Sequence, residues 1–325
     1  MNNNHKRRIL ALAGGVGGGK FARGLIAALP PESLALVVNT ADDFVHLGLH
    51  IAPDLDSVLY ALADLNDPVR GWGLSGETWN FMAATEQLGG ETWFRLGDRD
   101  VATHVFRTQQ LNEGRKLSEI TALLSTRFGV KHRVAPMSDD PVHSVVDTDE
   151  GPLPFQEYFV KRQCEPAYRG VRFEGIEQAQ PSSTLRAALH QASALVITPS
   201  NPFVSIAPIL ALPGVDEALR QWQGPVVAVS PIVGGQSVKG PLGKMMDELG
   251  LEKSPVGIAR HYGRLVDGWV IDIADKALAP EIEALGCRVK VCNTMMWTTD
   301  DKIRLARDTL ALVDALVEEP ADAAP

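Results

Sequence analysis

Cysteine is scarce in this sequence. The chain has only Cys164, Cys287 and Cys292, and no two of them form a C-x-x-C pair. An odd number of cysteines without paired spacing excludes a disulfide framework and offers no zinc knuckle, so we expect free, buried thiols. Such thiols are typical of a reducing compartment, and we therefore expect a cytoplasmic protein.

Long hydrophobic runs and an excess of basic charge are also missing. The first apolar run, residues 9–13, is shorter than the roughly 7 to 15 residues of a signal peptide's core. No run approaches the ~20 residues that span a bilayer, so we expect no membrane partner. Asp and Glu number 40 against 31 Lys and Arg, a formal charge of −9. This balance argues against a general nucleic-acid binder, and any phosphate must be bound locally.

The sequence does contain many short apolar runs of the kind that form buried parallel strands. These runs lie at residues 8–13, 34–39, 194–198, 225–230, 269–273 and 288–291. Segments with apolar residues at helical spacing lie between most of them, at 21–29, 184–191, 215–222, 242–249 and 302–317. The alternation predicts an α/β fold with a Rossmann-like, doubly wound, mostly parallel sheet, which binds ligands beyond the carboxyl ends of its strands.

The middle of the chain interrupts this alternation. Residues 58–128 have the pattern of several helices, and the runs 142–147 and 155–161 flank a turn at 148–154 like a hairpin. We therefore predict a nucleotide-binding core made of residues 1–60 and 181–325. The remaining residues, 61–180, are predicted to form a smaller inserted α+β lobe.

A glycine-rich segment follows the first predicted strand. Residues 11–25 read ALAGGVGGGKFARGL. The P-loop pattern fails at Phe21, where a Ser or Thr hydroxyl should hold magnesium. The dinucleotide pattern fails at Lys20, where a small residue should let the helix pack on the strand. A glycine turn that opens a helix still presents backbone N–H groups and a positive dipole end, so we expect it to bind a phosphate.

Four aspartates follow the second predicted strand. NTADDF and PDLDS contain Asp42, Asp43, Asp54 and Asp56. Two carboxylates ~4 Å apart repel by about 4 kcal/mol at an effective dielectric of about 20, which a divalent cation relieves. Oxygen ligands suit magnesium. The alternative is that some of the four cap a turn or a helix over 55–65. We expect at least one cap and at least one metal or substrate ligand.

Three further clusters have both a structural and a functional interpretation. His46 and His50 have zinc-like spacing, but the glycine and proline around them disfavour a helix, so we do not expect zinc. Asp98 and Asp100 in GDRD either cap the following helix or face a ligand, which leaves Arg99 free to face one. Half of the tryptophans, Trp72, Trp79 and Trp93, lie close together and form either core or a slot for a flat heterocycle.

Two loops follow later strands of the predicted sheet. They are TPSNPFVS at 198–205 and SPIVGGQSVKGP at 230–241. Ser200 and Asn201 can bind a purine edge or a phosphate, and the second loop adds Lys239 and free backbone donors. Ordinary loop chemistry is the alternative interpretation.

The motifs taken together resemble a known family. In order they are AGGVGGGK, NTADDF, PDLDSVLY, RGWG, LGDRDVATH, MSDDPV, SNPFVSI and SPIVGG, and they resemble the 2-phospho-L-lactate transferase family (CofD/FbiA) over nearly the whole chain. The resemblance implies an enzyme that transfers a phosphorylated three-carbon acid from a guanosine-diphosphate carrier to 7,8-didemethyl-8-hydroxy-5-deazariboflavin (FO). GMP would leave, Mg²⁺ would assist, and the product would be the core of coenzyme F420. Lactyl, enolpyruvyl and glyceryl groups stay open.

The resemblance also implies roles for individual residues. The diphosphate would face Gly14, Gly15, Gly17, Gly18, Gly19 and Lys20. The guanosine would face Ser200, Asn201, Gly234, Gly235, Lys239 and Gly240. Metal contacts would be Asp43 and Asp54, the FO side would include Asp54, Asp56, Trp72 and Arg99, and Asp43 or Asp56 would accept the proton of the attacking hydroxyl.

Two other functions remain possible at this point. One is a regulatory, non-catalytic protein of the same superfamily, similar to the gluconeogenesis-factor group, which binds a nucleotide sugar or a dinucleotide. The other is a nicotinamide dehydrogenase, which Lys20 disfavours. The expected partners are small-molecule substrates and a second copy of the chain, since paired subunits are common.

Overall fold

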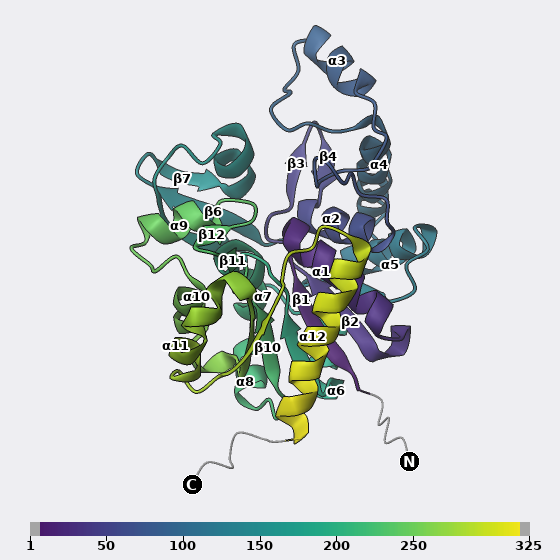
Figure 1. The fold of residues 1–325 in the computed structure, drawn as a ribbon. Helices are drawn as coiled ribbons and strands as arrows, with labels where there is room; N and C mark the ends of the chain where they lie inside the picture. The colour runs from purple at the N-terminus through teal and green to yellow at the C-terminus, as the bar shows by residue number, and fades with distance from the viewer. Residues whose placement is uncertain (1–6, 319–325) are drawn as a thin grey trace.

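A seven-stranded sheet forms the centre of the molecule (Figure 1). The computed structural model of the protein describes residues 7–318. The strands, in spatial order, are β14 (Arg288–Cys292), β13 (Gly268–Asp272), β10 (Val226–Val229), β9 (Ala194–Ile197), β1 (Ile9–Ala13), β2 (Leu34–Val38) and β5 (Arg133–Pro136). All the pairings within it are parallel, which confirms the predicted α/β fold.

Both faces of the sheet are buried, as the continuous apolar runs predict. Successive residues of a strand point to opposite faces, and β1 shows this directly. Leu10 and Leu12 lie in the hydrophobic core on one face. Ile9, Ala11 and Ala13 lie in the core on the other face. The short apolar runs therefore form buried strands, because their alternate side chains pack into the cores on the two faces of the sheet.

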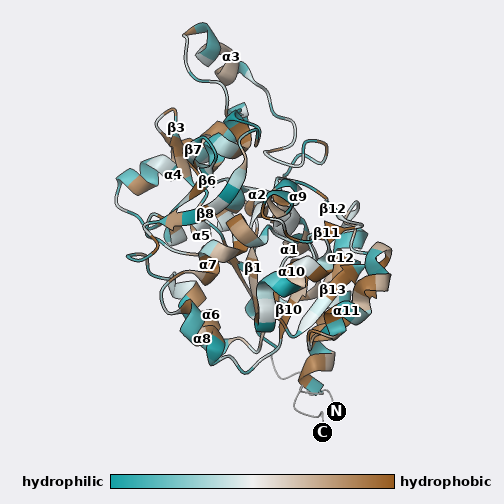
Figure 2. Cartoon of the chain, turned by 90° about the vertical axis from the view of Figure 1, so that its left-hand side faces the viewer, coloured by the Kyte–Doolittle hydropathy of each residue, from teal (hydrophilic) through white to brown (hydrophobic). Residues whose placement is uncertain are grey.

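Helices cover each face of the sheet. One face is covered by α1 (Gly15–Ala28), α2 (Pro53–Leu62), α5 (Leu117–Arg127) and α12 (Thr299–Glu318). The other is covered by α6 (Ser183–Gln191), α7 (Ala207–Leu210), α8 (Val215–Arg220), α9 (Leu242–Glu248), α10 (Pro255–Tyr262) and α11 (Ala279–Glu283). Figure 1 shows α1 and α12 side by side, and Figure 2 shows hydrophobic and hydrophilic stretches alternating along the helices. These amphipathic helices bury their apolar sides against the sheet.

The remaining elements form smaller structures above the sheet. They are the hairpin β3 (Phe44–His46) and β4 (Leu49–Ile51), helices α3 (Asn80–Gln87) and α4 (Asp98–Asn112), the antiparallel sheet of β7 (Gly151–Pro154), β6 (His143–Thr148) and β8 (Tyr168–Glu174), and the ribbon β11 (Ile232–Val233) with β12 (Gln236–Ser237). Short helical turns are η1 (Pro31–Ser33), η2 (Glu157–Lys161), η3 (Pro202–Ile206), η4 (Gly263–Leu265) and η5 (Ile273–Leu278). Figure 1 shows α3 on an arm that projects away from the sheet.

The predicted hairpin exists, but its second strand was placed wrongly. β6 pairs with β7 at residues 151–154, so the turn takes up only residues between Thr148 and Gly151. Residues 157–161, which were expected to be strand, form the helical turn η2 instead. Apolar residues spaced by three and four along this segment fit a short helix as well as a strand, and period alone could not separate the two.

One strand of the central sheet comes from inside the predicted lobe. β5 pairs in parallel with β2, although residues 133–136 lie within the range 61–180. Helix α5, just before it, packs into the same core as α1 and α12. The arm with α3 and the β3–β4 hairpin stand apart from the central layers (Figure 2). The β7–β6–β8 sheet, by contrast, contributes Val146 and Tyr168 to one of the two cores.

The strand order places a ligand-binding edge between β1 and β9. From β1 the chain proceeds to β2 and β5 on one side, and then crosses to β9 on the other. A parallel sheet binds ligands where its order reverses in this way, at the carboxyl ends of the strands. In residues 7–318 no helix combines the length and the apolar character needed to cross a membrane.

Candidate active site

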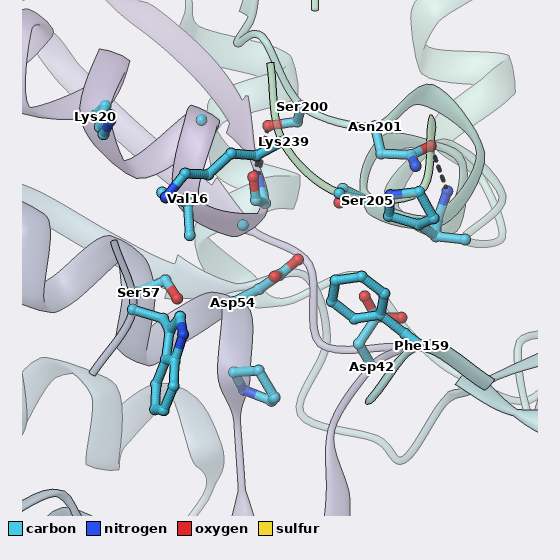
Figure 3. Close-up of a pocket in the computed structure, with 18 of the residues that line it drawn as sticks. Val16, Lys20, Asp42, Asp54, Ser57, Phe159, Ser200, Asn201, Ser205 and Lys239 are labelled. Atoms are coloured by element: carbon cyan, nitrogen blue, oxygen red, sulfur yellow. Dashed lines mark hydrogen bonds between the residues drawn. The ribbon is translucent and has the colours of Figure 1, made fainter. Parts of the chain in front are cut away.

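A cavity of about 710 Å³ opens at this edge (Figure 3). We call it the central cavity. One wall is made by the start of α1 and by the loops that follow β9, β10 and β14. The other wall is made by α2, by parts of residues 70–73 and 93–95, and by the segment 155–163. The cavity thus joins the sheet's ligand-binding edge to the smaller structures above it.

The glycine-rich segment is the first part of helix α1 and not a loop ahead of it. The helix begins at Gly15, which has a φ of +63°. A Cβ atom at Gly14 would lie 2.5 Å from Asp54 Oδ2, and one at Gly17 would lie 2.5 Å from the carbonyl oxygen of Pro199. Glycine is needed here because neighbouring groups approach the backbone too closely for any side chain.

The later glycines of the segment serve packing. A Cβ atom at Gly18 would lie 2.6 Å from Ser200 Oγ, and one at Gly19 would lie 3.1 Å from the carbonyl oxygen of Ser57. Neither glycine lines the central cavity, whereas the other four residues predicted to face the diphosphate do, namely Gly14, Gly15, Gly17 and Lys20. Diphosphate binding by this segment remains a prediction. Of the predicted residues, only these four are positioned to contact a ligand in the cavity.

Three lysines create a local positive region in an otherwise acidic protein. Burial, and then repulsion by Lys239 and Lys302, lower the pKa of Lys20. Lys20 and Lys239 line the central cavity, and Figure 3 shows Lys239 extending toward Val16 of α1. Its Nζ donates to the carbonyl oxygen of Arg70 at 3.2 Å. An anion bound at the start of α1 would relieve the mutual repulsion of these cations.

The four aspartates lie close together, and three of them line the cavity. Asp42 and Asp43 follow β2, and Asp54 and Asp56 lie in the first turn of α2. All four are buried, at most 8% exposed. The cap of α2 is Ala52, so the expectation that Asp54 or Asp56 caps this helix is wrong. Their position inside the first turn still places both near the positive end of the helix dipole.

Burial dominates the electrostatics of this acid cluster. It raises the pKa of Asp54 to about 6 and that of Asp42 well above its usual range, with the charge of Asp54 adding to the latter. Burial also raises the pKa of Asp43 strongly, although Arg107 acts in the opposite direction. Asn39 donates to Asp54 Oδ2 at 3.0 Å and partly offsets the effect there. The cluster is therefore short of positive charge.

The donor set fits a hard divalent cation. Asp42 Oδ1 and both carboxylate oxygens of Asp43 are buried without a hydrogen-bond partner among the described residues. A buried polar atom without a partner costs about 1–3 kcal/mol, and more when it is charged. Oxygen ligands of this kind suit Mg²⁺. Asp42, Asp54 and Asp56 line the central cavity and Asp43 does not. Metal binding by Asp43 and Asp54 remains a prediction.

A second polar group beside the acid cluster was missed by the sequence interpretation. Arg107 of α4 donates to Asp56 Oδ1, and His104 lies one turn earlier, with Nδ1 3.6 Å from Asp56 Oδ2. His104 Nε2 is 3.5 Å from Asp100 Oδ1, to which Tyr60 donates at 2.5 Å. The available signal was the spacing of residues 100, 104 and 107, which puts three polar groups on one face of a helix.

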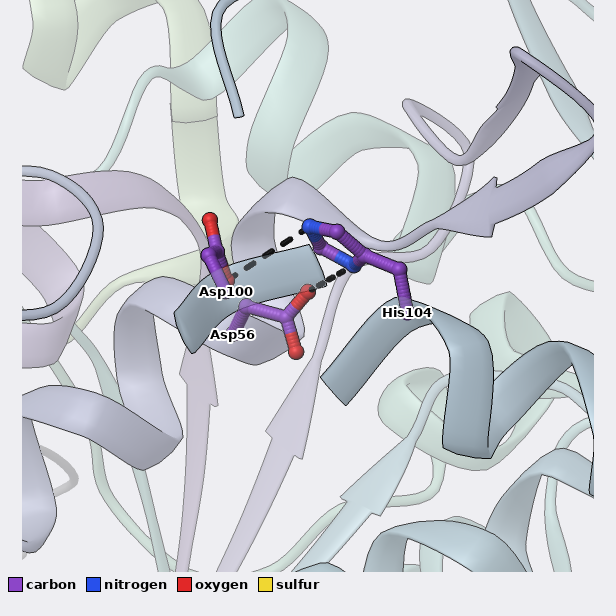
Figure 4. A group of neighbouring side chains, drawn as sticks. All are labelled: Asp56, Asp100 and His104. Carbon is purple, nitrogen blue, oxygen red and sulfur yellow. Dashed lines mark ion pairs between the residues drawn. The ribbon is translucent and has the colours of Figure 1, made fainter. Parts of the chain in front are cut away.

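Part of this group could hold a metal ion on geometric grounds. One ligand atom each from Asp56, Asp100 and His104 lies within 4.8 Å of the others, and all three residues are buried. Figure 4 shows the two ring nitrogens of His104 facing one carboxylate each, that of Asp56 and that of Asp100. The identity of any ion does not follow from this arrangement.

The residues predicted for the FO side divide into two groups. Trp72 lines the central cavity and is 40% exposed. Arg99 does not line it, and its guanidinium donates instead to the carbonyl oxygen of Ser75 at 2.5 Å. Arg70 and Arg95 reach the cavity in its place. Sequence spacing alone could not tell which arginine of this region faces inward.

The start of α4 and the arm exchange capping hydrogen bonds: a carboxylate of each accepts from backbone N–H groups of the other. Gly97 precedes the helix, so neither Asp98 nor Asp100 is its cap residue. The backbone N–H groups of residues 99 and 100 donate to the carboxylate of Glu77. Asp98 accepts from the backbone N–H groups of Asn80 and Phe81, at the start of α3. These bonds fix the arm on α4.

Of the six residues predicted to face the guanosine, some line the central cavity and others do not. Ser200, Asn201, Lys239 and Gly240 line the central cavity, and Gly234 and Gly235 do not. The Ser200 hydroxyl donates to the carbonyl oxygen of Gly14 at 2.8 Å, which ties the loop after β9 to α1. The N–H group of Gly234 donates to Asp275 at 3.0 Å. All six assignments remain predictions.

Two lining segments were not anticipated. Residues 294–297, between β14 and α12, line the central cavity, and Trp297 there is 74% exposed. Phe159 of η2 lines the opposite side and stacks on Phe155, with ring centroids 5.5 Å apart. Trp93 also lines the cavity. The aromatic surface is therefore broader than the three tryptophans considered from the sequence.

Among the remaining candidate groups, His50 approaches the acid cluster, with its Nε2 3.9 Å from Asp43 Oδ2. His46 and His50 are on the two strands of the β3–β4 hairpin and not on a helix. Cys164 and Cys287 are buried, Cys292 is partly buried, and all three are free thiols.

Comparison with known proteins gives a consistent result over the full length. The family profile described as "2-phospho-L-lactate transferase CofD" matches residues 9–304. A phosphoenolpyruvate transferase from Streptomyces griseus is 41% identical over 94% of this chain and 98% of its own. A 2-phospho-L-lactate transferase from Methanosarcina mazei is 40% identical over 92% of this chain and 98% of its own.

Solved structures support the fold. A member of the UPF0052 family from Bacillus halodurans superimposes with a TM-score of 0.59 over 94% of this chain and 98% of that chain. At 17% identity this likeness concerns the fold alone. The sequence identity to the two transferases, by contrast, is about 40% and extends over more than nine tenths of this chain. The chain is thus an enzyme that belongs to the 2-phospho-L-lactate transferase CofD family.

Proposed function

We propose that this chain transfers a phosphorylated three-carbon acid from a guanosine-diphosphate carrier to the ribityl hydroxyl of FO, releasing GMP and forming the core of coenzyme F420. The relatives, a 2-phospho-L-lactate transferase and a phosphoenolpyruvate transferase, support the reaction type. The observation that carries the proposal is the central cavity. It brings the glycine start of α1, the acid cluster and an aromatic wall to one place.

The donor would bind along the wall formed by α1 and the later loops. The first N–H groups of α1 have no partners within the helix, and Lys20 and Lys239 add positive charge to the same wall. Ser200 and Asn201 also line the cavity, and we propose that they contact the carrier's guanosine. The loop at 234–240 is proposed to close around the guanosine, with Lys239 and Gly240 in contact.

The acceptor would bind along the opposite wall. Trp72 and Phe159 offer aromatic faces to a flat deazaflavin ring, and Asp54 points into the space between α1 and Phe159 (Figure 3). Asp56 lies deeper in the same wall. Because Arg99 lies away from the cavity, we propose Arg70 or Arg95 in its role.

The chemistry asks for positioning more than for covalent participation. The ribityl hydroxyl would attack the phosphorus distal to guanosine, in line with the departing GMP. Asp43 or Asp56 would accept the hydroxyl proton, and the amides of α1 would hold the diphosphate oxygens. Mg²⁺, held by Asp43 and Asp54, would neutralise charge on the diphosphate.

The identity of the transferred acid is open to a direct experiment. The purified full chain is incubated with FO, Mg²⁺ and, in separate reactions, the lactyl, enolpyruvyl and glyceryl carriers. We expect one carrier to give both GMP and an FO adduct of the corresponding mass by mass spectrometry. If none of the three yields an adduct while FO and carrier are recovered intact, the proposal is wrong.

We also propose that the chain forms a homodimer, because closed pairs are the commonest assembly of soluble proteins. Light scattering behind a sizing column should then give twice the chain mass of 35.1 kDa. A mass equal to one chain at micromolar concentration would rule the dimer out.

A further inference from the structure

The acid cluster contains more carboxylates than one cation needs. Asp42, Asp43 and Asp54 form one part of it, and Asp56 forms a second part together with Asp100. The second part has the geometry of a metal site, since ligand atoms of its two carboxylates and His104 lie within 4.8 Å of one another (Figure 4). The two parts differ in their hydrogen bonds: Arg107 donates to Asp56, and no guanidinium or ammonium among the described residues donates to Asp42, Asp43 or Asp54.

Arg107 already contacts two of the three residues of the second part, Asp56 and His104, while Asp56 Oδ2 and His104 Nε2 have no hydrogen-bond partner among the described residues. Its guanidinium donates to Asp56 Oδ1, to His104 Nδ1 at 3.3 Å and to the carbonyl oxygen of His50 at 3.2 Å. Arg107 is 1% exposed and does not line the central cavity. A guanidinium carries a permanent charge and only donates, so it supplies the positive charge that a metal ion would otherwise bring.

The contact with Arg107 also fixes the tautomer of His104. Because the guanidinium donates to Nδ1, that nitrogen is an acceptor, and the imidazole proton sits on Nε2. Nε2 faces Asp100 Oδ1 at 3.5 Å, and Tyr60 donates to the same oxygen at 2.5 Å. One ring nitrogen is therefore engaged and the other is protonated, and neither offers a free lone pair to a metal.

The first part of the cluster has no guanidinium or ammonium in hydrogen-bond contact among the described residues. Asp42 Oδ1 and both oxygens of Asp43 are buried and accept no hydrogen bond from the described residues. Three carboxylates meet there. The charge of Arg107 reaches Asp43 and His50 Nε2 lies 3.9 Å from Asp43 Oδ2, but the hydrogen bond of Arg107 goes to Asp56. Positive charge from outside the chain is needed on this side and not on the other.

We propose that Arg107 is a positioning residue that acts as an internal cation: it takes the place of a metal in the Asp56–His104–Asp100 group, holds Asp56 in one orientation, and so confines metal binding to Asp42, Asp43 and Asp54. The part played by Asp56 toward the acceptor rests on the proposed function. Arginine suits the task because its planar fork reaches a carboxylate and an imidazole at once, which a lysine ammonium cannot do with the same geometry.

The number of metal ions bound per chain tests this proposal without any measurement of enzyme activity. The metal-free full chain is titrated with Co²⁺, and bound ions per chain are counted by calorimetry and elemental analysis, with the visible spectrum reporting imidazole ligation. We expect Arg107→Gln to bind one ion more than the wild type. Adding His104→Gln to that variant should return the count to the wild-type value. Arg115→Gln, at an exposed arginine just after α4, is the matched control and should not change the count.

Two results would overturn the proposal. One is an unchanged count in folded Arg107→Gln. The other is a wild-type chain that loses an ion on His104→Gln alone, because then the His104 group already holds metal. The second comparison needs no change at Arg107, so it decides the matter even if Arg107→Gln fails to fold.

The positioning role is tested by a variant that keeps the charge. Arg107→Lys should leave the ion count at the wild-type value and lower kcat about 10- to 100-fold, with KM for the carrier little changed, as is typical when an outer partner of a functional carboxylate is lost. A kcat within twofold of the wild type would contradict it. If the wild type itself forms no product from FO and any carrier, the proposed function fails, while the Co²⁺ counts still decide where the metal binds.

Discussion

Asp43 is a buried carboxylate whose charge is poorly compensated by the described residues. It is 6% exposed, and neither of its carboxylate oxygens has a hydrogen-bond partner among the described residues. Burial raises its pKa far above the usual range, and the charges of Asp42, Asp54 and Asp56 add to the effect. A residue in this position weakens the fold unless a cation meets it, which points to a functional reason for its presence.

Replacing this residue tests the assignment. We predict that Asp43→Asn lowers kcat by a factor of about 10² to 10³, the usual effect of losing one well-placed group, worth about 3 kcal/mol. The folded structure should persist, because asparagine removes a buried charge and keeps the shape. Steady-state rates and thermal unfolding of the same samples measure both effects.

A surface aspartate provides the comparison. Asp216 on α8 is 72% exposed and pairs with Arg220 on the surface. Asp216→Asn should leave both the rate and the midpoint of unfolding unchanged within error, since exposed ion pairs contribute little. An Asp43→Asn variant with wild-type turnover would show that the metal assignment is wrong.

The sequence identified some of the site and missed other parts for a physical reason. The glycine start of α1 and the pair Asp42 and Asp43 were found because they follow strands, and the ends of parallel strands meet at one edge. Asp54 and Asp56 were found because they come shortly afterwards in the sequence. Arg107 and His104 were missed because they lie on α4, and the contact of a helix face with a distant cluster depends on tertiary packing. Arg99 was chosen over Arg70 and Arg95 for the same reason, since the loop path decides which side chain points inward.

At the scale of elements, the close contact between α1 and α12 requires a glycine at position 24. A Cβ atom at Gly24 of α1 would lie 2.0 Å from the carbonyl oxygen of Lys302 in α12. The two helices therefore approach so closely that the backbone of one fills the position of a side chain on the other. Because α1 starts at the proposed phosphate site, this contact also sets the position of that site.

We predict that Gly24→Ala destabilises the protein by about 1–3 kcal/mol, the range typical of overpacking in a core. The higher helix propensity of alanine opposes this by up to about 1 kcal/mol, so a net loss shows that the close contact dominates. Urea unfolding followed by circular dichroism gives the free energy of unfolding.

Gly170→Ala on β8 is the control for this substitution. A Cβ atom there would meet nothing within 4 Å, and the backbone is not in the left-handed region. Gly170→Ala should leave the free energy of unfolding unchanged or slightly raised. If Gly24→Ala were as stable as this control, the helices would not pack as closely as described.

The elements of the central sheet could be predicted because they are repetitive. Six of its strands were expected within one residue or so of their observed bounds, since each is a short apolar run buried on both faces. The strand β5 was not recognised as part of the sheet, because residues 133–136 are few and β2 lies about 100 residues earlier in the chain. The segment 157–161 was expected to be strand, because a short apolar run does not distinguish strand from helix.

At the scale of the whole molecule, the buried carboxylates link stability to pH. Burial raises the pKa of Asp54 to about 6 in the folded chain, against about 4 when unfolded. A raised carboxyl pKa means that the folded state favours the protonated form. The corresponding stability is present in full below pH ~4 and is lost as pH rises from about 4 to about 6, by about 3 kcal/mol for this group.

Magnesium should restore that loss. We predict that saturating Mg²⁺ raises the midpoint of thermal unfolding by several degrees at pH 7.5 and by much less at pH 4.5, because protonated carboxyls do not bind the ion. The double variant Asp43→Asn, Asp54→Asn should show no pH-dependent effect of Mg²⁺. An equal shift at both pH values in the wild type, or an undiminished shift in the double variant, would place the ion elsewhere.

The most direct measurement of the central claim is a crystal structure with GDP and Mg²⁺. We predict that the diphosphate lies against the backbone of Gly14 to Gly17, that the ion contacts Asp54 with Asp42 or Asp43, and that the guanosine lies beside Ser200 and Asn201. Nucleotide bound away from the start of α1, or an ion bound at His104 and Asp100 instead, would contradict the account.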